Sequence, residues 1–178
     1  MKQIDITTAL RTAVRARRVL FWQATTIGIL AIAVGSVFFD RYRIGINLQE
    51  EHCIPGTTIM IVDLARRDIE RGGIYAFETP ELLRPILPEG VGLAKRILGL
   101  PGDHYAVTRD GIFINGKRVG EGLPYAQRFE RPEGFFHREG RVPDDRVWVM
   151  GDTPNSLDSR YIGTLPIESV VGRVEPVF

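Results

Sequence analysis

The longest apolar pattern in the chain runs from Val19 to Phe39, VLFWQATTIGILAIAVGSVFF, and contains no charged residue. At a rise of ~1.5 Å per residue, a helix of this length spans the ~30 Å hydrocarbon core of a bilayer. The run is longer than the apolar core of a cleaved signal peptide, and the charged stretch FFDRYR follows it. A buried core helix is the alternative, but basic residues flank the run and none lies within it. We therefore predict one uncleaved transmembrane helix at residues 19–39.

Basic residues are unevenly distributed around this run. Those that precede it are Lys2, Arg11, Arg15, Arg17 and Arg18, whereas Arg41 and Arg43 follow it closely. Because the more basic flank of a membrane helix stays in the cytoplasm, residues 1–18 are predicted to form a basic cytoplasmic segment. Residues 44–178 then lie on the other side. The pattern thus predicts a single-pass protein of the cytoplasmic (inner) membrane with a periplasmic main domain.

From Ile44 onward the apolar runs are short, and Gly or Pro recurs between them. Segments typical of strands are TTIMIVD, GGIYAFE, HYAVT, GIFING, RVWVMGD and SVVGRVEPVF. The turn signals RDG and NGK on either side of IFI favour hairpins. Residues 44–178 are therefore expected to be mainly β, with an inserted hairpin or lobe at about residues 104–147. Within that lobe, Phe135 and Phe136 are expected either under it or exposed at its tip.

Composition and charge exclude several functions. The net charge of +1 provides no basic surface for nucleic acid. A single cysteine, Cys53, excludes an internal disulfide framework and a four-cysteine zinc site. The histidines His52, His104 and His137 are scattered and lack the spacing of metal ligands. We therefore expect no metal, no cofactor and no nucleic-acid partner.

Lys95 occupies the apolar segment GLAKRILGLPG. Residues two apart in a strand share a face, so Lys95 lies with Leu93 and Ile97 while Arg96 points the other way. Burial disfavours the charged form of a lysine, and a neutral amine is what a general base requires. Taken alone, the pattern favours a simpler interpretation, an exposed lysine whose aliphatic stem follows the surface.

A second polar group lies in the segment NSLDSRYIG. Asp158 and Arg160 are two residues apart and can pair on one strand face. The hydroxyl of Ser156 has lone pairs that can accept a hydrogen bond from a buried amine. Taken alone, this segment is an ordinary polar loop.

Four segments, KRILGLPGD, DGIFINGKRV, VPDDRVWVMGD and NSLDSRYIG, together resemble the type I signal peptidase family in order and spacing. The resemblance covers roughly residues 53–175 and the N-terminal anchor, and it is greatest to the TraF-type branch of conjugative transfer systems. It implies a domain of twisted antiparallel sheets that acts as a membrane-anchored endopeptidase on membrane-inserted precursors with small residues before the cut. The TraF-type branch further implies maturation of a conjugative pilin, including joining of its ends, with membrane lipid and conjugative secretion machinery as partners.

The resemblance also implies a role for individual residues. Cys53, in the segment CIP, stands where the family has its serine nucleophile. Lys95 stands at the position of the general base, and Ser156 at that of the serine that orients the base. Asp158 and Arg160 match the ion pair that braces the site.

Several positions depart from the family pattern. A cysteine replaces the serine, GDTPNS is one residue shorter than GDNRDNS, and GGIY stands for GDIV. Glu51 stands where the family often has a hydroxyl that donates to the oxyanion, and an ionised carboxylate cannot donate. The remaining donors for the oxyanion are the Cys53 backbone N–H and a hydroxyl such as that of Thr57 or Thr58.

Cys53 itself has three interpretations: a working nucleophile, an inactivating change, or an inert buried thiol. A thiol ionises near pH ~8.5 and needs less activation than a hydroxyl. We favour Lys95 over His52 as its base, because adjacent residues of an extended segment point to opposite faces. The alternative function is a catalytically silent, membrane-tethered scaffold of a conjugative secretion system.

Overall fold

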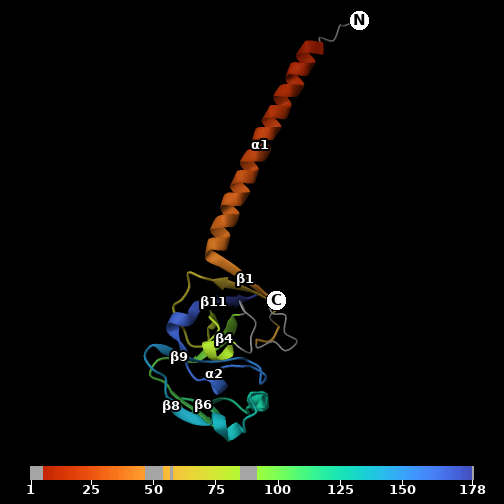
Figure 1. The fold of residues 1–178 in the computed structure, drawn as a ribbon. Coiled ribbons are helices and arrows are strands. Elements are labelled where there is room, and N and C mark those ends of the chain that lie inside the picture. The colour runs from red at the N-terminus through yellow and green to blue at the C-terminus, as the bar shows by residue number, and fades with distance from the viewer. Residues whose placement is uncertain (1–5, 47–53, 57, 85–91, 178) are drawn as a thin grey trace. The chain divides into compact units, whose positions relative to one another are not determined.

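A computed structural model describes residues 6–46, 54–56, 58–84 and 92–177. The chain divides into two compact units, Met1–Arg41 and Tyr42–Phe178. Figure 1 draws both units, with the N-terminal helix in red to orange.

The first unit is one long helix, α1 (Ile6–Arg41). Its stretch Val14–Arg41 is long and apolar enough to cross a membrane, with a mean hydropathy of 1.7 and no buried part. The hydroxyls of Thr25 and Thr26 donate hydrogen bonds to the main-chain carbonyls of Phe21 and Trp22, each at 2.9 Å. These hydrogen bonds satisfy the two hydroxyl groups, which would find no water partner in the hydrocarbon core of a membrane. The N-terminal apolar helix predicted at residues 19–39 is therefore present, and it begins within the basic segment.

The second unit is built from two antiparallel sheets, as the sequence predicted. The larger sheet has the order β1-β2-β11-β3-β4-β9-β10. Its strands are β1 (Tyr42–Ile46), β2 (Ile59–Asp63), β3 (Ile74–Phe77), β4 (Leu93–Gly99), β9 (Arg146–Met150), β10 (Leu165–Pro166) and β11 (Val170–Pro176). The smaller sheet has the order β7-β6-β5-β8. Its strands are β5 (His104–Thr108), β6 (Gly111–Ile114), β7 (Lys117–Gly120) and β8 (Arg138–Arg141).

Short helical turns connect these strands. They are η1 (Glu81–Leu83), η2 (Pro124–Phe129), η3 (Glu133–Phe136), α2 (Ser159–Ile162) and η4 (Ile167–Ser169). The segment with η2 and η3, residues 121–137, is rich in aromatic side chains and is called here the aromatic segment. In it Phe136 is buried and Phe135 is 61% exposed. Burial and exposure were the two alternatives expected for this pair, and each applies to one of the two phenylalanines.

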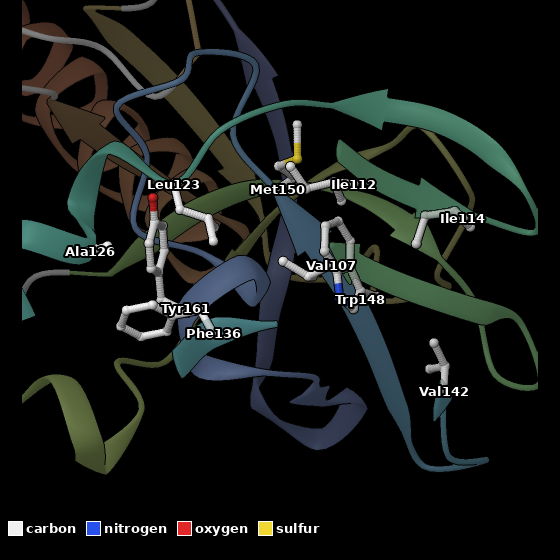
Figure 2. Close-up of a cluster of buried hydrophobic side chains, with 10 residues drawn as sticks. All are labelled: Val107, Ile112, Ile114, Leu123, Ala126, Phe136, Val142, Trp148, Met150 and Tyr161. Atoms are coloured by element: carbon white, nitrogen blue, oxygen red, sulfur yellow. The ribbon is translucent and has the colours of Figure 1, made fainter. Parts of the chain in front are cut away.

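Strand β9 is apolar on both faces because both faces are covered. Val147 and Val149 belong to one buried cluster of the larger sheet. Trp148 and Met150 belong to another cluster, which the smaller sheet and the aromatic segment complete (Figure 2). A strand buried on both faces loses the polar–apolar alternation of a half-exposed one. This double burial places β9, and the loop that follows it, in the centre of the domain.

A third buried cluster lies on the other part of the larger sheet and contains Ile54, Val62, Ile74 and Val174. Strand β2 is apolar on its opposite face as well. There Ile59 pairs with Ile46 of β1, and both side chains are exposed, by 39% and 63%. The first strands after α1 therefore carry apolar side chains on an uncovered face.

The turn Leu100–Asp103 carries the chain from the larger sheet to the smaller one. Gly102 has φ +83°, a conformation that favours glycine. The Asp103 carboxylate accepts hydrogen bonds from the Leu100 N–H at 2.6 Å and the Asn115 side chain at 2.7 Å. It also pairs with Arg71 at 2.7 Å. Asp103 thereby ties together a loop of the larger sheet and a turn of the smaller sheet.

Candidate active site

Lys95 lies in the middle of β4, where buried and half-buried residues alternate from Leu93 to Gly99. The alternation puts its side chain on the covered face with Leu93 and Ile97, and only 2% of the residue is exposed. The interpretation that the pattern alone favoured, an exposed lysine, is therefore wrong. Leu93 and Ile97, which share this face, belong to a buried cluster with side chains of β3 and β9. The spacing of β4 alone does not reveal this burial.

A buried amine requires a polar partner, and Lys95 has one in Ser156. Lys95 Nζ donates a hydrogen bond to Ser156 Oγ at 2.8 Å. Ser156 is itself fully buried and lies in the loop after β9. The structure thus brings together two residues that the sequence separates by 61 positions.

Asp158 and Arg160 form a buried ion pair beside this contact. Arg160 Nε lies 2.8 Å from Asp158 Oδ1, and Arg160 Nη2 lies 2.9 Å from Oδ2. Asp158 also caps α2 by accepting the Arg160 N–H, and it accepts the Gly151 N–H at 2.9 Å. Arg160 Nη2 in turn donates to the Ser156 carbonyl at 3.0 Å. The pair therefore holds both ends of the loop that presents Ser156.

A second ion pair, between Arg96 and Asp152, was not singled out by the sequence analysis. It is bidentate, with Nε–Oδ1 at 2.7 Å and Nη2–Oδ2 at 2.5 Å. Arg96 also donates to the Gly72 carbonyl at 2.7 Å. The hydrogen bond with Asp152 raises the pKa of Arg96 above its ordinary value, although burial opposes this. The alternation of β4, which points Arg96 away from Lys95, was the available signal, but it does not identify an acidic partner 56 residues away.

Cys53 lies outside the described residues, as do Glu51, His52 and Thr57. The next residue, Ile54, is described and is 6% exposed. Ile54 belongs to the third cluster, against which Ala94 packs. The chain directly after Cys53 is therefore anchored in the same cluster as the neighbour of Lys95.

These groups can carry out acid–base and nucleophilic steps with protein side chains alone. Within the described ranges, no three His, Cys, Asp or Glu side chains are grouped as they would be around a metal ion. The distinctive element is a buried amine held by a hydroxyl, which is the arrangement of a general base shielded from water.

Comparisons with known proteins agree with the motifs. A family model described as "Signal peptidase, peptidase S26" matches residues 17–178. A probable signal peptidase I-2 of Synechocystis sp. is 37% identical over 151 residues, which cover 83% of this chain and 66% of that protein. A signal peptidase I of Bacillus amyloliquefaciens is 38% identical over 165 residues, which cover 84% of this chain and 81% of that protein. The chain thus spans about two thirds of the length of the Synechocystis relative.

Among solved structures, a signal peptidase I from Enterococcus faecalis V583 matches 61% of this chain and 97% of its own, with a TM-score of 0.39 and 27% identity. That TM-score is too low to add weight, so the assignment rests on the sequence matches. The family model covers nearly the whole chain, and the relatives match most of it. The chain therefore belongs to the signal peptidase family, peptidase S26.

Proposed function

We propose that the protein is a membrane-anchored endopeptidase that uses Lys95 as its general base. The observation that carries this proposal is the 2.8 Å hydrogen bond from Lys95 to Ser156, buried within a chain of the signal peptidase family. An enzyme that had lost its activity would have no need to keep an amine buried, because the burial of a lysine is costly.

In the proposed reaction, Cys53 Sγ attacks the scissile carbonyl while Lys95 takes the thiol proton. Lys95 then gives that proton to the leaving amine, and the acyl group remains on sulfur as a thioester. Ser156 orients Lys95, and Asp158 with Arg160 holds the loop. Ile54, next to Cys53, packs in the cluster that also contains Ala94, on the face of β4 opposite the Lys95 side chain, so the pairing of Cys53 with Lys95 rests on the order of the motifs.

The proposed topology places residues 1–18 in the cytoplasm, residues 19–39 in the inner membrane and residues 44–178 in the periplasm. The basic residues before the helix support this orientation. The exposed Ile46 and Ile59, on the first two strands after the helix, suit a domain held near lipid. Residues 104–147 form the proposed inserted lobe of this domain.

The proposed substrates are membrane-inserted precursors with small residues before the cut, and for a TraF-type enzyme a conjugative pilin. Cys53 gives this finer proposal a chemical basis, because a thioester reacts readily with amines relative to water. If the N-terminal amine of the same precursor is held close by, its nitrogen attacks the thioester, an amide bond forms and the cysteine thiol is regenerated. Proximity favours this outcome, since effective molarities of well-placed groups reach ~10⁵ M or more. Conjugative secretion machinery is the proposed partner.

The test is the intact mass of a pilin-like precursor that is co-expressed with the full-length protein. We expect wild type to process the precursor, and Lys95→Arg and Cys53→Ala to leave it intact. Lys117→Arg, a change at an exposed lysine of β7, is the matched control and should behave as wild type. Unprocessed precursor with wild type would instead favour a silent scaffold in the secretion system.

The same measurement separates cutting from joining, because a ring is one water lighter than the matching linear chain. Cys53→Ser should shift the product toward the linear form if the thioester favours amine attack. A wild-type product that is entirely linear would reject the joining reaction and leave an endopeptidase with a cysteine nucleophile.

A further inference from the structure

Helix α2 carries Arg160, and its position depends on contacts outside the proposed catalytic residues. This helix has only four residues, Ser159–Ile162, and begins directly after Asp158. One helical turn is not stable by itself, because the first turn fixes several residues for a single hydrogen bond. Tyr161, in the middle of α2, is only 4% exposed although it has no part in the proposed reaction. Its surroundings therefore supply the stability that α2 lacks.

Three rings of the aromatic segment enclose the ring of Tyr161. Phe129 stacks on it, with ring centroids 5.8 Å apart and an angle of 25° between the planes. Phe136 meets it edge-on at 5.2 Å, and Tyr125 does so at 6.0 Å. In Figure 2 the rings of Tyr161 and Phe136 lie next to each other, on the side of the cluster that also holds Leu123. Aromatic pairs in these geometries contribute beyond the apolar area that they bury.

Polar contacts attach α2 to the same part of the chain. The Tyr161 hydroxyl accepts the N–H of Tyr125 at 3.0 Å. Arg138 Nη2 donates to the Tyr161 carbonyl at 2.9 Å, and its Nε donates to the Phe136 carbonyl at 3.2 Å. Ring, hydroxyl and main chain of Tyr161 are thus each held by residues 125–138. This arrangement fixes both the position and the rotation of α2.

The other side of α2 leads to the general base through two hydrogen bonds. Arg160, the neighbour of Tyr161, donates to the Ser156 carbonyl at 3.0 Å. Ser156 Oγ accepts from Lys95 Nζ at 2.8 Å. All of these residues are buried, so a rotation of α2 displaces Arg160 and with it the Ser156 hydroxyl. A displacement of about 1 Å in such a group costs up to about a hundredfold in rate.

We propose that Tyr161 and Phe129 are positioning residues for Lys95: the aromatic segment clamps α2 so that Ser156 keeps its hydroxyl on the lysine. The proposal rests on the proposed function and assigns a role to a segment outside the catalytic motifs. It predicts that a change at Phe129 or Tyr161 acts on catalysis through Ser156 and leaves substrate binding unaffected.

The test is a double-mutant cycle in the full-length protein, with kcat and KM measured for cleavage of a precursor peptide. Phe129→Ala removes the stacked ring, and we expect kcat to fall by about 10- to 100-fold with KM nearly unchanged. Phe129→Ala added to Ser156→Ala should cost little more than Ser156→Ala alone, because the ring acts through that hydroxyl. If the two losses multiply instead, the ring does not act through Ser156 and the proposal fails.

Phe135→Ala is the matched control. Phe135 belongs to the same segment, but among the described rings it packs on Phe136 and on the guanidinium of Arg131 rather than on Tyr161. We expect Phe135→Ala to change kcat by less than about twofold, in keeping with an exposed side chain. A loss equal to that of Phe129→Ala would indicate a general effect on the segment and would reject the clamp.

Two further variants cover the case in which Phe129→Ala does not fold. Phe129→Leu keeps an apolar side chain without the flat ring, and Tyr161→Phe removes only the acceptor for the Tyr125 N–H. Both should lower kcat in the same cycle with Ser156→Ala, by smaller factors than Phe129→Ala.

A second measurement does not depend on activity. Hydrogen exchange of residues 151–162 should be faster in Phe129→Leu than in wild type and unchanged in Phe135→Ala. Unchanged exchange in Phe129→Leu would overturn the clamp, whether or not the enzyme is active. Activity in Lys95→Arg would instead reject the proposed function, which separates the two failures.

Discussion

Two arginine–carboxylate pairs of the second unit have the same chemistry and opposite surroundings. Arg160–Asp158 lies at 2.8 Å with side chains 1% and 0% exposed. Arg66–Glu175 lies at 3.3 Å with side chains 50% and 56% exposed. Buried charges have lost their hydration and depend on the protein for replacement hydrogen bonds, whereas an exposed pair keeps its water. From this difference we expect burial, rather than the mere presence of an ion pair, to decide how much each pair contributes to stability.

The pair Arg96–Asp152 lies between these extremes, with side chains 31% and 28% exposed. It holds the same loop as Asp158 and Arg160, but from the half-open face of β4. The three pairs therefore form a series in exposure, and the changes below test whether their effects follow it.

The largest effect is expected at the buried lysine itself. Lys95→Arg keeps a positive charge next to Ser156, but a guanidinium does not release its proton at neutral pH and so removes the base. We expect kcat to fall by about 10²- to 10⁴-fold, the usual contribution of a general base. Cleavage assays with Lys117→Arg in parallel provide the control for an exposed lysine. Near-normal cleavage by Lys95→Arg would remove Lys95 from the mechanism.

Breaking the buried pair should come next. Asp158→Ala leaves Arg160 buried without its carboxylate, and we expect a loss of about 3–5 kcal/mol in the free energy of unfolding. Arg66→Ala breaks the exposed pair and leaves the contact of Glu175 with Arg173 at 3.4 Å in place, and it should cost about 0–1 kcal/mol. Chemical denaturation of both variants measures the contrast. Equal losses would mean that burial does not determine how much each pair contributes to the free energy of unfolding.

The intermediate pair should give an intermediate result. Asp152→Ala removes a bidentate partner that is only partly shielded from water, so we expect about 1 kcal/mol of lost stability. Because the loop that presents Ser156 loses one anchor, kcat should fall by roughly tenfold or less. Denaturation and cleavage assays on the same preparation measure the loss of stability and the fall in kcat. A loss as large as that of Asp158→Ala would break the proposed series.

The smallest effect depends on pH and concerns Asp103. Burial alone would raise the pKa of this carboxyl, but hydrogen bonds from Asn115, the Leu100 N–H and Arg71 outweigh it and hold the pKa below 3.8. A lowered pKa means that the stabilisation is complete above the unfolded-state pKa and is lost as the pH falls through the folded-state pKa.

Melting temperatures of wild type and Asp103→Asn test this dependence. Their difference should be constant between about pH 5 and pH 7 and should shrink below about pH 4. A difference that stays constant into this acidic range would contradict the role of the Asp103 charge.

The sequence by itself determined the features that depend on local pattern. The apolar run from Val19 to Phe39 predicted a membrane-length helix because length and composition alone define one. The alternation around Lys95 predicted which neighbours share its face, since the period of a strand is fixed. The order of the motifs identified the family, and the proposal that Cys53 is the nucleophile rests on that order alone.

Tertiary structure decided what covers each face and which distant residues meet. The spacing of β4 is the same whether its apolar face is open or covered, so only the tertiary structure showed that Lys95 is buried. The contacts of Lys95 with Ser156 and of Arg96 with Asp152 join segments more than 50 positions apart, and they follow from strand register. Register is a property of paired strands, and no single strand in the sequence specifies its partner. Phe136 rather than Phe135 is buried because it packs in the cluster with Tyr161, a contact between separate segments that the sequence does not specify.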